Sequence, residues 1–135
     1  MNEKCVIVLD ESLPTGLIAN TAAILGITLG AKLPGVVGND VRDGDGNGHM
    51  GIIEFPVPIL KASSEALGKL RLALYGSDYA DVTTVDFTDI AQSCKTYDEF
   101  IDRIGAADEL RYFGVAMCGA VKKVNRLTGS MALLR

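Results

Sequence analysis

The sequence contains few of the residue types from which small proteins usually assemble a metal or nucleophile site. Its 135 residues include one histidine, three cysteines and no tryptophan. A single histidine excludes a histidine-rich metal cluster. The widely separated Cys5, Cys94 and Cys118 have neither the pairing of a disulfide framework nor the CxxC spacing of a zinc site. We therefore predict reduced thiols, no metal ion and no cofactor.

Long apolar runs and an excess of basic charge are absent as well. The first apolar run, Cys5 to Leu9, is too short for a signal-peptide core or a membrane span. The net charge of −4 weighs against nucleic-acid binding, because neutralising phosphates requires clustered Lys and Arg. These absences predict a cytoplasmic protein without a membrane partner, and they make a nucleic acid an unfavoured partner.

The charges that are present are unevenly distributed. Residues 78–109 hold nine acidic residues and two basic ones, whereas residues 110–135 hold five basic residues and no acidic one. We expect these two segments to lie near one another, with their charges solvated or paired. The alternative is a basic helix that meets an anionic partner.

Strand-like and helix-like segments alternate along the chain. Apolar runs at residues 5–9 and 112–118 predict buried strands, and the β-branched segment 82–87 predicts a further strand. Helices are expected up to Gly30, after Ser63 or Ser64, after Thr96 and from Gly119. This order predicts a single compact α/β domain over residues 1–135, with three layers and a mixed or mostly parallel sheet covered by helices.

Hydroxyl residues mark the expected helix starts. Ser12 or Thr15 is the expected N-cap of the first helix, and Thr96 with Glu99 has the spacing of a capping box. The helix after Thr96 is expected to turn Phe100, Ile101 and Ile104 inward.

The turn-rich segment Asp43-Gly-Asp-Gly-Asn-Gly48, together with Glu54, matches the letters of an EF-hand calcium loop. An EF-hand needs a helix on each side, and Pro34, Pro56 and Pro58 oppose long flanking helices. Gly, Asn and Asp are also the residues that a hairpin tip requires. We therefore predict a β-hairpin around residues 36–58, with Pro56 and Pro58 leading to a sheet edge.

Polar residues at the ends of the predicted strands form the candidate site. If the strands are parallel, Asp10, Asp86 and Cys118 meet at one edge of the sheet, beside Thr88 and Gly119. Asp86 is the candidate catalytic carboxylate, which would position water or a hydroxyl group for attack on an ester. Asp10, Thr88, Cys118 and Gly119 are candidate binding residues.

Each of these residues also has a purely structural interpretation. Asp10 and Asp86 could cap the loops and helices that follow them. Cys118 is either a core thiol or a thiol activated by the N-terminus of the helix that follows it. Both interpretations stay open for all three residues.

Several segments resemble a known family. The opening Lys4-Cys-Val-Ile-Val-Leu-Asp10, the transition through Gly16 into a helix with Ala19, and the ending Gly119 to Leu133 are similar to type II peptidyl-tRNA hydrolases. Over nearly all residues, the chain resembles more closely an uncharacterised bacterial domain-of-unknown-function family grouped with that fold. The quoted features are Pro14-x-Gly16, the Asp-Gly-Asp-Gly hairpin, Val57-Pro-Ile-Leu60 and Leu127-Thr-Gly-Ser130.

The resemblance implies a small α/β sandwich with a mixed four-stranded sheet, a homodimer and, for the hydrolases, cleavage of the ester that joins peptide to tRNA. The hydrolase motif carries a lysine after the glycine and a histidine further along the helix, where this sequence has Leu17 and Ile24. We therefore predict a homodimeric protein that binds a small molecule or a protein partner without this hydrolysis. The alternatives are an esterase acting on an acylated tRNA through Asp86 and a thiol enzyme centred on Cys118.

Overall fold

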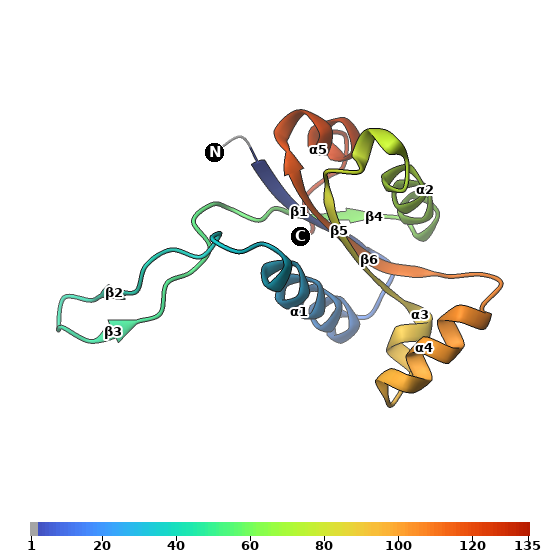
Figure 1. Cartoon of the computed structure of the whole chain (residues 1–135), viewed down its shortest axis with the longest axis horizontal. Helices are drawn as coiled ribbons and strands as arrows, with labels where there is room; N and C mark the ends of the chain where they lie inside the picture. Colours follow the sequence, from blue (N-terminus) through green and yellow to red (C-terminus); the bar gives the residue numbers. More distant parts are fainter. Residues whose placement is uncertain (1–2) are drawn as a thin grey trace.

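The computed structural model describes residues 3–135 and shows a sheet enclosed between helices, with a long hairpin extending from it (Figure 1). The sheet has four strands in the order β4-β1-β6-β5. Their bounds are Glu3–Asp10 for β1, Ile59–Ala62 for β4, Thr83–Thr88 for β5 and Tyr112–Ala120 for β6. The mixed four-stranded sheet is therefore as expected.

The strand directions differ from the prediction of a mostly parallel sheet. Only β1 and β4 pair in parallel, whereas β6 runs antiparallel to both β1 and β5. The reason lies in the short helices α3 (Asp89–Ser93) and α4 (Tyr97–Ala106), which stay at the sheet end where β5 finishes (Figure 1). The chain re-enters the sheet at that same end, so β6 has to run back beside β5.

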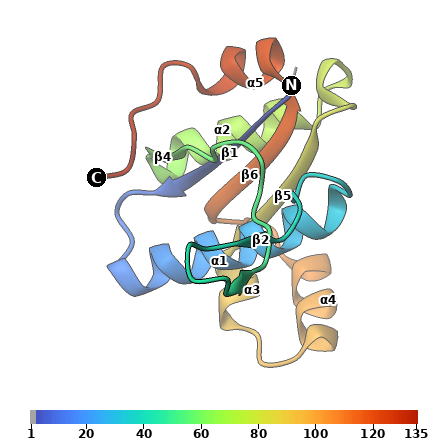
Figure 2. The same cartoon turned by 90° about the vertical axis from the view of Figure 1, so that its left-hand side faces the viewer.

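Helices cover both faces of the sheet. Helix α1 (Thr15–Lys32) packs on one face and contributes Leu25 and Leu29 to the core there. Helices α2 (Ser64–Leu74) and α5 (Val121–Thr128) pack on the other face and contribute Leu67 and Val124 (Figure 2). Because β1 and β6 are buried on both faces, their sequences are almost continuously apolar.

The predicted caps are confirmed for two helices and wrong for α1. The Ser63 Oγ accepts a hydrogen bond from the Ala66 N–H at 3.1 Å, and the Thr96 Oγ1 accepts one from the Glu99 N–H at 3.1 Å. Helix α1 instead follows Pro14 without a side-chain cap, and Ser12 bonds elsewhere.

The apolar face of α4 also differs from the prediction at one position. Phe100 and Ile104 are half-buried, but Ile101 is 54% exposed, because α4 packs beside the sheet rather than on it.

The segment between α1 and β4 forms the predicted hairpin, with strands β2 (Val41–Arg42) and β3 (Gly48–His49). We call residues 36–55 the arm, because it projects away from the sandwich and, in Figure 2, toward the viewer in front of α1. At its tip, the Asp43 Oδ1 accepts hydrogen bonds from the Asp45 and Asn47 N–H groups at 3.0 Å. The acidic motif thus serves as a turn, and Pro56 and Pro58 lead into the edge strand β4, as predicted.

Across residues 3–135, the structure has no group of three or more His, Cys, Asp or Glu side chains that could hold a metal ion. Within the same range, every helix falls short of the length and apolarity required to cross a bilayer.

Candidate functional site

The structure brings part of the predicted constellation together. Asp10 ends β1 and Thr88 ends β5, and both lie beside the first residues of β6, where Leu9 and Phe87 are each in register with Gly114. Cys118 is in register with Cys5 and Thr83, at the opposite end of the same strands. Because β6 runs antiparallel, Cys118 and Gly119 do not join the other residues.

Asp10 is a buried carboxylate whose hydrogen bonds join neighbouring segments of the chain. Its side chain is 0% exposed and accepts hydrogen bonds from the Ser12 N–H at 2.9 Å, the Ser12 hydroxyl at 2.7 Å and the Arg111 guanidinium at 2.8 Å. Burial alone would raise the pKa of Asp10, but the bonds from Ser12 and Arg111 outweigh it and hold the pKa below its ordinary value. This carboxylate ties the β1–α1 turn to the start of β6.

Asp86 is held by an arginine of α2. Its Oδ2 accepts a hydrogen bond from the Arg71 Nε at 2.7 Å, and both side chains are largely buried. The Arg71 guanidinium also stacks over the ring of Tyr75, 3.7 Å from its centroid. Asp86 therefore does not cap the following helix, and its carboxylate is already engaged by a cation.

Thr88 and Gly119 have local structural roles. The Thr88 Oγ1 caps α3 by accepting a hydrogen bond from the Ala91 N–H at 3.3 Å. At Gly119, an added Cβ would lie 2.9 Å from the Val82 Cγ2, so glycine allows this close packing.

Cys118 is a core thiol. Burial, followed by its contact with Cys5 and by the nearby Glu3 carboxylate, raises the pKa of Cys118 to about 12. A thiol in this state stays protonated near neutral pH and is a poor nucleophile, which removes the basis for a thiol enzyme centred on Cys118.

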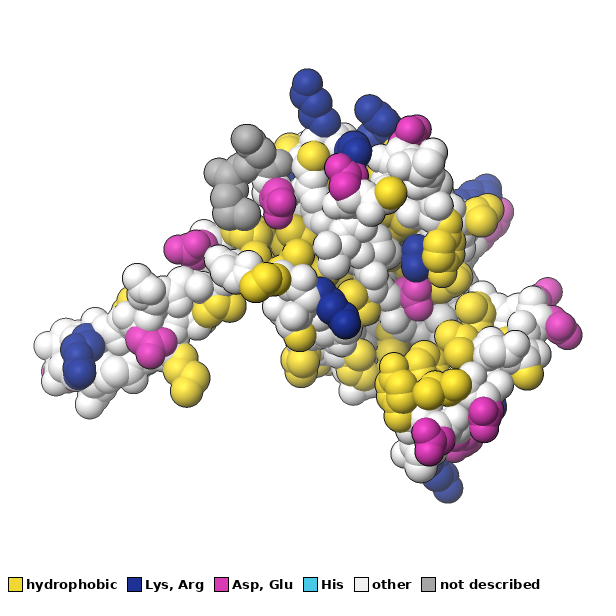
Figure 3. All heavy atoms as spheres, in the orientation of Figure 1, with side chains coloured by type: hydrophobic (Ala, Val, Ile, Leu, Met, Phe, Trp, Pro, Cys, Tyr) yellow, Lys and Arg dark blue, Asp and Glu magenta, His cyan; other side chains and the backbone are white. Residues whose placement is uncertain are grey.

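The cavity that best fits a small ligand is a groove at the β5 edge, which the sequence did not predict. Its volume is about 390 Å³, and it lies between α1, β5, α3 and α4. The lining includes Ile24 and Thr28 from α1, Val85 to Phe87 from β5, and Ala91, Cys94, Lys95, Thr96, Tyr97 and Phe100 from the α3–α4 region. In Figure 3, hydrophobic side chains gather over this region at the lower right.

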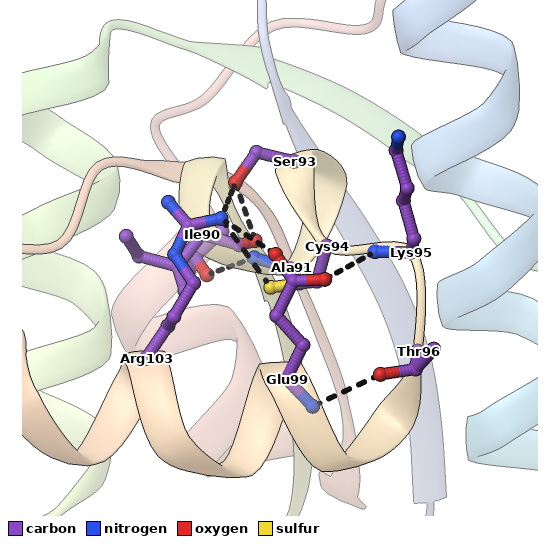
Figure 4. A network of polar contacts seen from close by, with 9 residues as sticks. Ile90, Ala91, Ser93, Cys94, Lys95, Thr96, Glu99 and Arg103 are labelled. Atoms are coloured by element: carbon purple, nitrogen blue, oxygen red, sulfur yellow. Dashed lines mark hydrogen bonds and ion pairs between the residues drawn. The ribbon is translucent and has the colours of Figure 1, made fainter.

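A polar network fixes the outer wall of this groove (Figure 4). The Arg103 Nη1 donates to the Ser93 Oγ at 2.8 Å and contacts the Cys94 Sγ at 3.7 Å, which joins α4 to the end of α3. The Glu99 Oε2 accepts a hydrogen bond from the Lys95 N–H at 3.1 Å. These contacts leave the apolar rings of Tyr97 and Phe100, 5.4 Å apart in an edge-to-face arrangement, at the groove.

Lys95 supplies a positive charge at the groove. Figure 4 shows its side chain pointing away from Glu99 and Arg103, and within the described part of the chain it forms no ion pair. An aromatic pair three residues apart, which begins two residues after a lysine, is the one sequence signal that could have indicated this groove.

Comparisons with known proteins give a family and a fold. No curated protein matches the chain. A solved structure of a protein of unknown function from Agrobacterium tumefaciens strain C58 matches with a TM-score of 0.89 and 20% sequence identity, over 100% of this chain and 99% of that one. The model of the family described as protein of unknown function (DUF2000) matches residues 3–135. The chain therefore belongs to the DUF2000 family.

Proposed function

We propose that this protein binds a small apolar carboxylic acid in the groove between α1, β5 and α4, without hydrolysing it. The observation that carries the proposal is the combination of an apolar groove with one cationic side chain, Lys95, at its lining. Small-molecule sites are typically concave, about 300–1,000 Å³ in volume, mostly apolar and equipped with a few polar groups that orient the ligand.

The chemistry of the lining supports binding rather than catalysis. Ile24 occupies the groove wall at the position where the resemblance to type II peptidyl-tRNA hydrolases would place a histidine. Asp86, the carboxylate that an esterase mechanism would use, accepts its hydrogen bond from Arg71. A general base needs a free acceptor within reach of the attacking hydroxyl, and an arginine partner competes for that acceptor.

Two fluorescent probes that differ in charge test the proposal. Anilinonaphthalene sulfonate is an apolar anion, and N-phenyl-1-naphthylamine is a neutral relative of similar size. We expect both probes to bind the wild-type protein. Lys95→Gln should weaken the binding of the anionic probe about fivefold, because one exposed charge pair contributes about 1 kcal/mol. The affinity for the neutral probe should not change.

Variants separate the groove from other surfaces. Ile24→Trp should fill the groove and weaken the binding of both probes. Lys69→Gln, which removes an exposed lysine of α2, should change neither. Equal binding to wild type and Ile24→Trp would contradict the proposed site, and release of peptide from peptidyl-tRNA that depends on Asp86 would favour the esterase instead.

A further inference from the structure

The arm is a fixed structure that exposes apolar side chains. Every residue from 39 to 50 is exposed, and Val41, Met50 and Ile52 are 57%, 87% and 79% exposed. In Figure 1, no helix or strand of the sandwich lies beside the arm's tip. Apolar side chains held out on a projecting hairpin are typical of an interaction surface.

Hydrogen bonds of its own hold the arm in this conformation. At its base, the Gly38 N–H donates to the Ile52 carbonyl at 2.9 Å, and the Gly51 N–H donates to the Asp40 Oδ1 at 2.9 Å. The two backbones approach so closely that a Cβ on Gly51 would overlap the Gly38 carbonyl oxygen. An arm that is already ordered loses little conformational entropy when it docks.

The exposed surface of the chain is larger than that of a compact monomer. It amounts to 8432 Å² for a mass of 14.3 kDa. The size relation for monomeric proteins gives about 6,800 Å² at this mass, so the chain exposes an excess of about 1,600 Å². A stable protein–protein interface needs about 800 Å² from each partner, which the excess exceeds.

The chain also carries a surface that fits the arm. The outer face of α1 exposes Ala19, Ala23 and Ile27, with Ile27 75% exposed, and no charged residue occurs between Thr15 and Ala31. A surface helix normally carries charged residues on its solvent face, so an uncharged outer face indicates a covered one. Residues 33–35 alone separate α1 from the arm, so the arm starts at the C-terminal end of this helix, and in Figure 2 it lies in front of α1.

We propose that two copies of this chain form an isologous homodimer in which the arm of each copy packs its apolar side chains across the outer face of α1 of the other. In a dimer with a two-fold axis, each arm contacts the α1 helix of the other copy, so the arm and the outer face of α1 are buried in both copies. This pairing is independent of the proposed ligand groove, which lies on the Ile24 and Thr28 side of α1.

Light scattering and sedimentation at micromolar concentration test this dimer. Wild type should have twice the monomer mass of 14.3 kDa. The double variant Met50→Asp and Ile52→Asp should weaken dimerisation at least about 100-fold, because such anchor side chains carry most of the energy of an interface. Ile27→Asp, on the receiving surface, should have the same effect.

Leu72→Asp is the matched control, because Leu72 is 74% exposed on α2, away from both surfaces. It should leave the dimer intact. Circular dichroism should show all the variants folded, since each altered side chain is exposed. A monomeric wild type would overturn the proposal, and so would an arm variant that folds and stays as dimeric as wild type.

Discussion

The sandwich and the arm use apolar residues in opposite ways. In the sandwich, Val6, Val8 and Leu9 of β1 are completely buried between the helices of the two faces. In the arm, Met50 and Ile52 lie almost entirely in solvent, although hydrogen bonds from Gly38 to Ile52 and from Gly51 to Asp40 hold the backbone around them. Packing within the chain accounts for the apolar residues of β1 but gives the exposed apolar residues of the arm no partner. We therefore expect function at the periphery of the molecule.

The sharpest way to test this contrast is to add volume to the sandwich core and to the periphery of the molecule, and the largest effect is expected in the core. A Cβ on Gly114 would lie 2.9 Å from side-chain atoms of Leu9, Leu25 and Thr21. Gly114→Val should therefore lower the free energy of unfolding by about 3 kcal/mol, the upper end of the range for overpacked cores.

Gly105→Ala is the matched change in the periphery, because a Cβ on Gly105 in α4 would meet no atom within 4 Å. It should leave stability unchanged or raise it by up to about 1 kcal/mol through helix propensity. Urea denaturation measures both variants, and similar midpoints for the two would contradict the contrast between a tightly packed sandwich and an open periphery.

An intermediate effect is expected at the buried Asp10 carboxylate, which pairs with the half-exposed Arg111. Asp10→Asn should cost about 2 kcal/mol, because it replaces a carboxylate that accepts hydrogen bonds from a charged partner and from Ser12. Glu11→Gln is the neighbouring control, and should cost less than about 0.5 kcal/mol, because Glu11 is half exposed and meets Lys61 only at 3.9 Å.

The effect of Asp10 should depend on pH in one direction. Its folded-state pKa is lowered, so its contribution is fully present above the unfolded-state pKa of about 4 and is lost as the pH falls through the folded-state value. The stability difference between wild type and Asp10→Asn should therefore be constant from about pH 5 to 8 and shrink below about pH 4. A difference that grows in acid would show that this carboxylate is not stabilised as described.

The smallest effect concerns one hydroxyl group between α1 and the sheet. Thr21 is completely buried, and its Oγ1 has no hydrogen-bond partner within the described residues. Thr21→Val keeps the shape and should stabilise the fold by about 1 kcal/mol. Thr128→Val is the control, since the Thr128 hydroxyl donates to the Val124 carbonyl at 2.8 Å and its loss should not stabilise. Thermal unfolding distinguishes the two.

The elements that could be predicted from the sequence are those with a strong local signal. Continuous apolar runs identified β1 and β6, and β-branched residues identified β5. The hydroxyl caps at Ser63 and Thr96 marked the starts of α2 and α4. At the first helix the same kind of signal was misleading, because the Ser12 hydroxyl bonds to the Asp10 carboxylate and not to a helix N–H. The acidic segment 78–109 and the basic segment 110–135 contact each other at one ion pair, in which the Lys123 Nζ lies 2.7 Å from the Asp81 Oδ1.

The candidate site was predictable only in part. The ends of β1 and β5 lie at the same edge of the sheet, on either side of β6, as expected. Cys118 lies at the opposite edge, because the direction of β6 depends on where α3 and α4 pack. The groove brings Ile24 together with Val85 and Phe100. Ile24 and Val85 are more than 60 positions apart in the sequence, so no local sequence pattern could indicate that they line one cavity.

The sequence by itself determined which segments are strands and helices and which side chains are apolar enough to be buried, because these properties follow from neighbouring residues through backbone sterics and periodicity. The tertiary structure decided the direction of β6, the pairing of the buried Asp10 with Arg111, the groove beside β5 and the exposure of the arm. These depend on contacts between distant segments, whose energies exist only once the chain has packed.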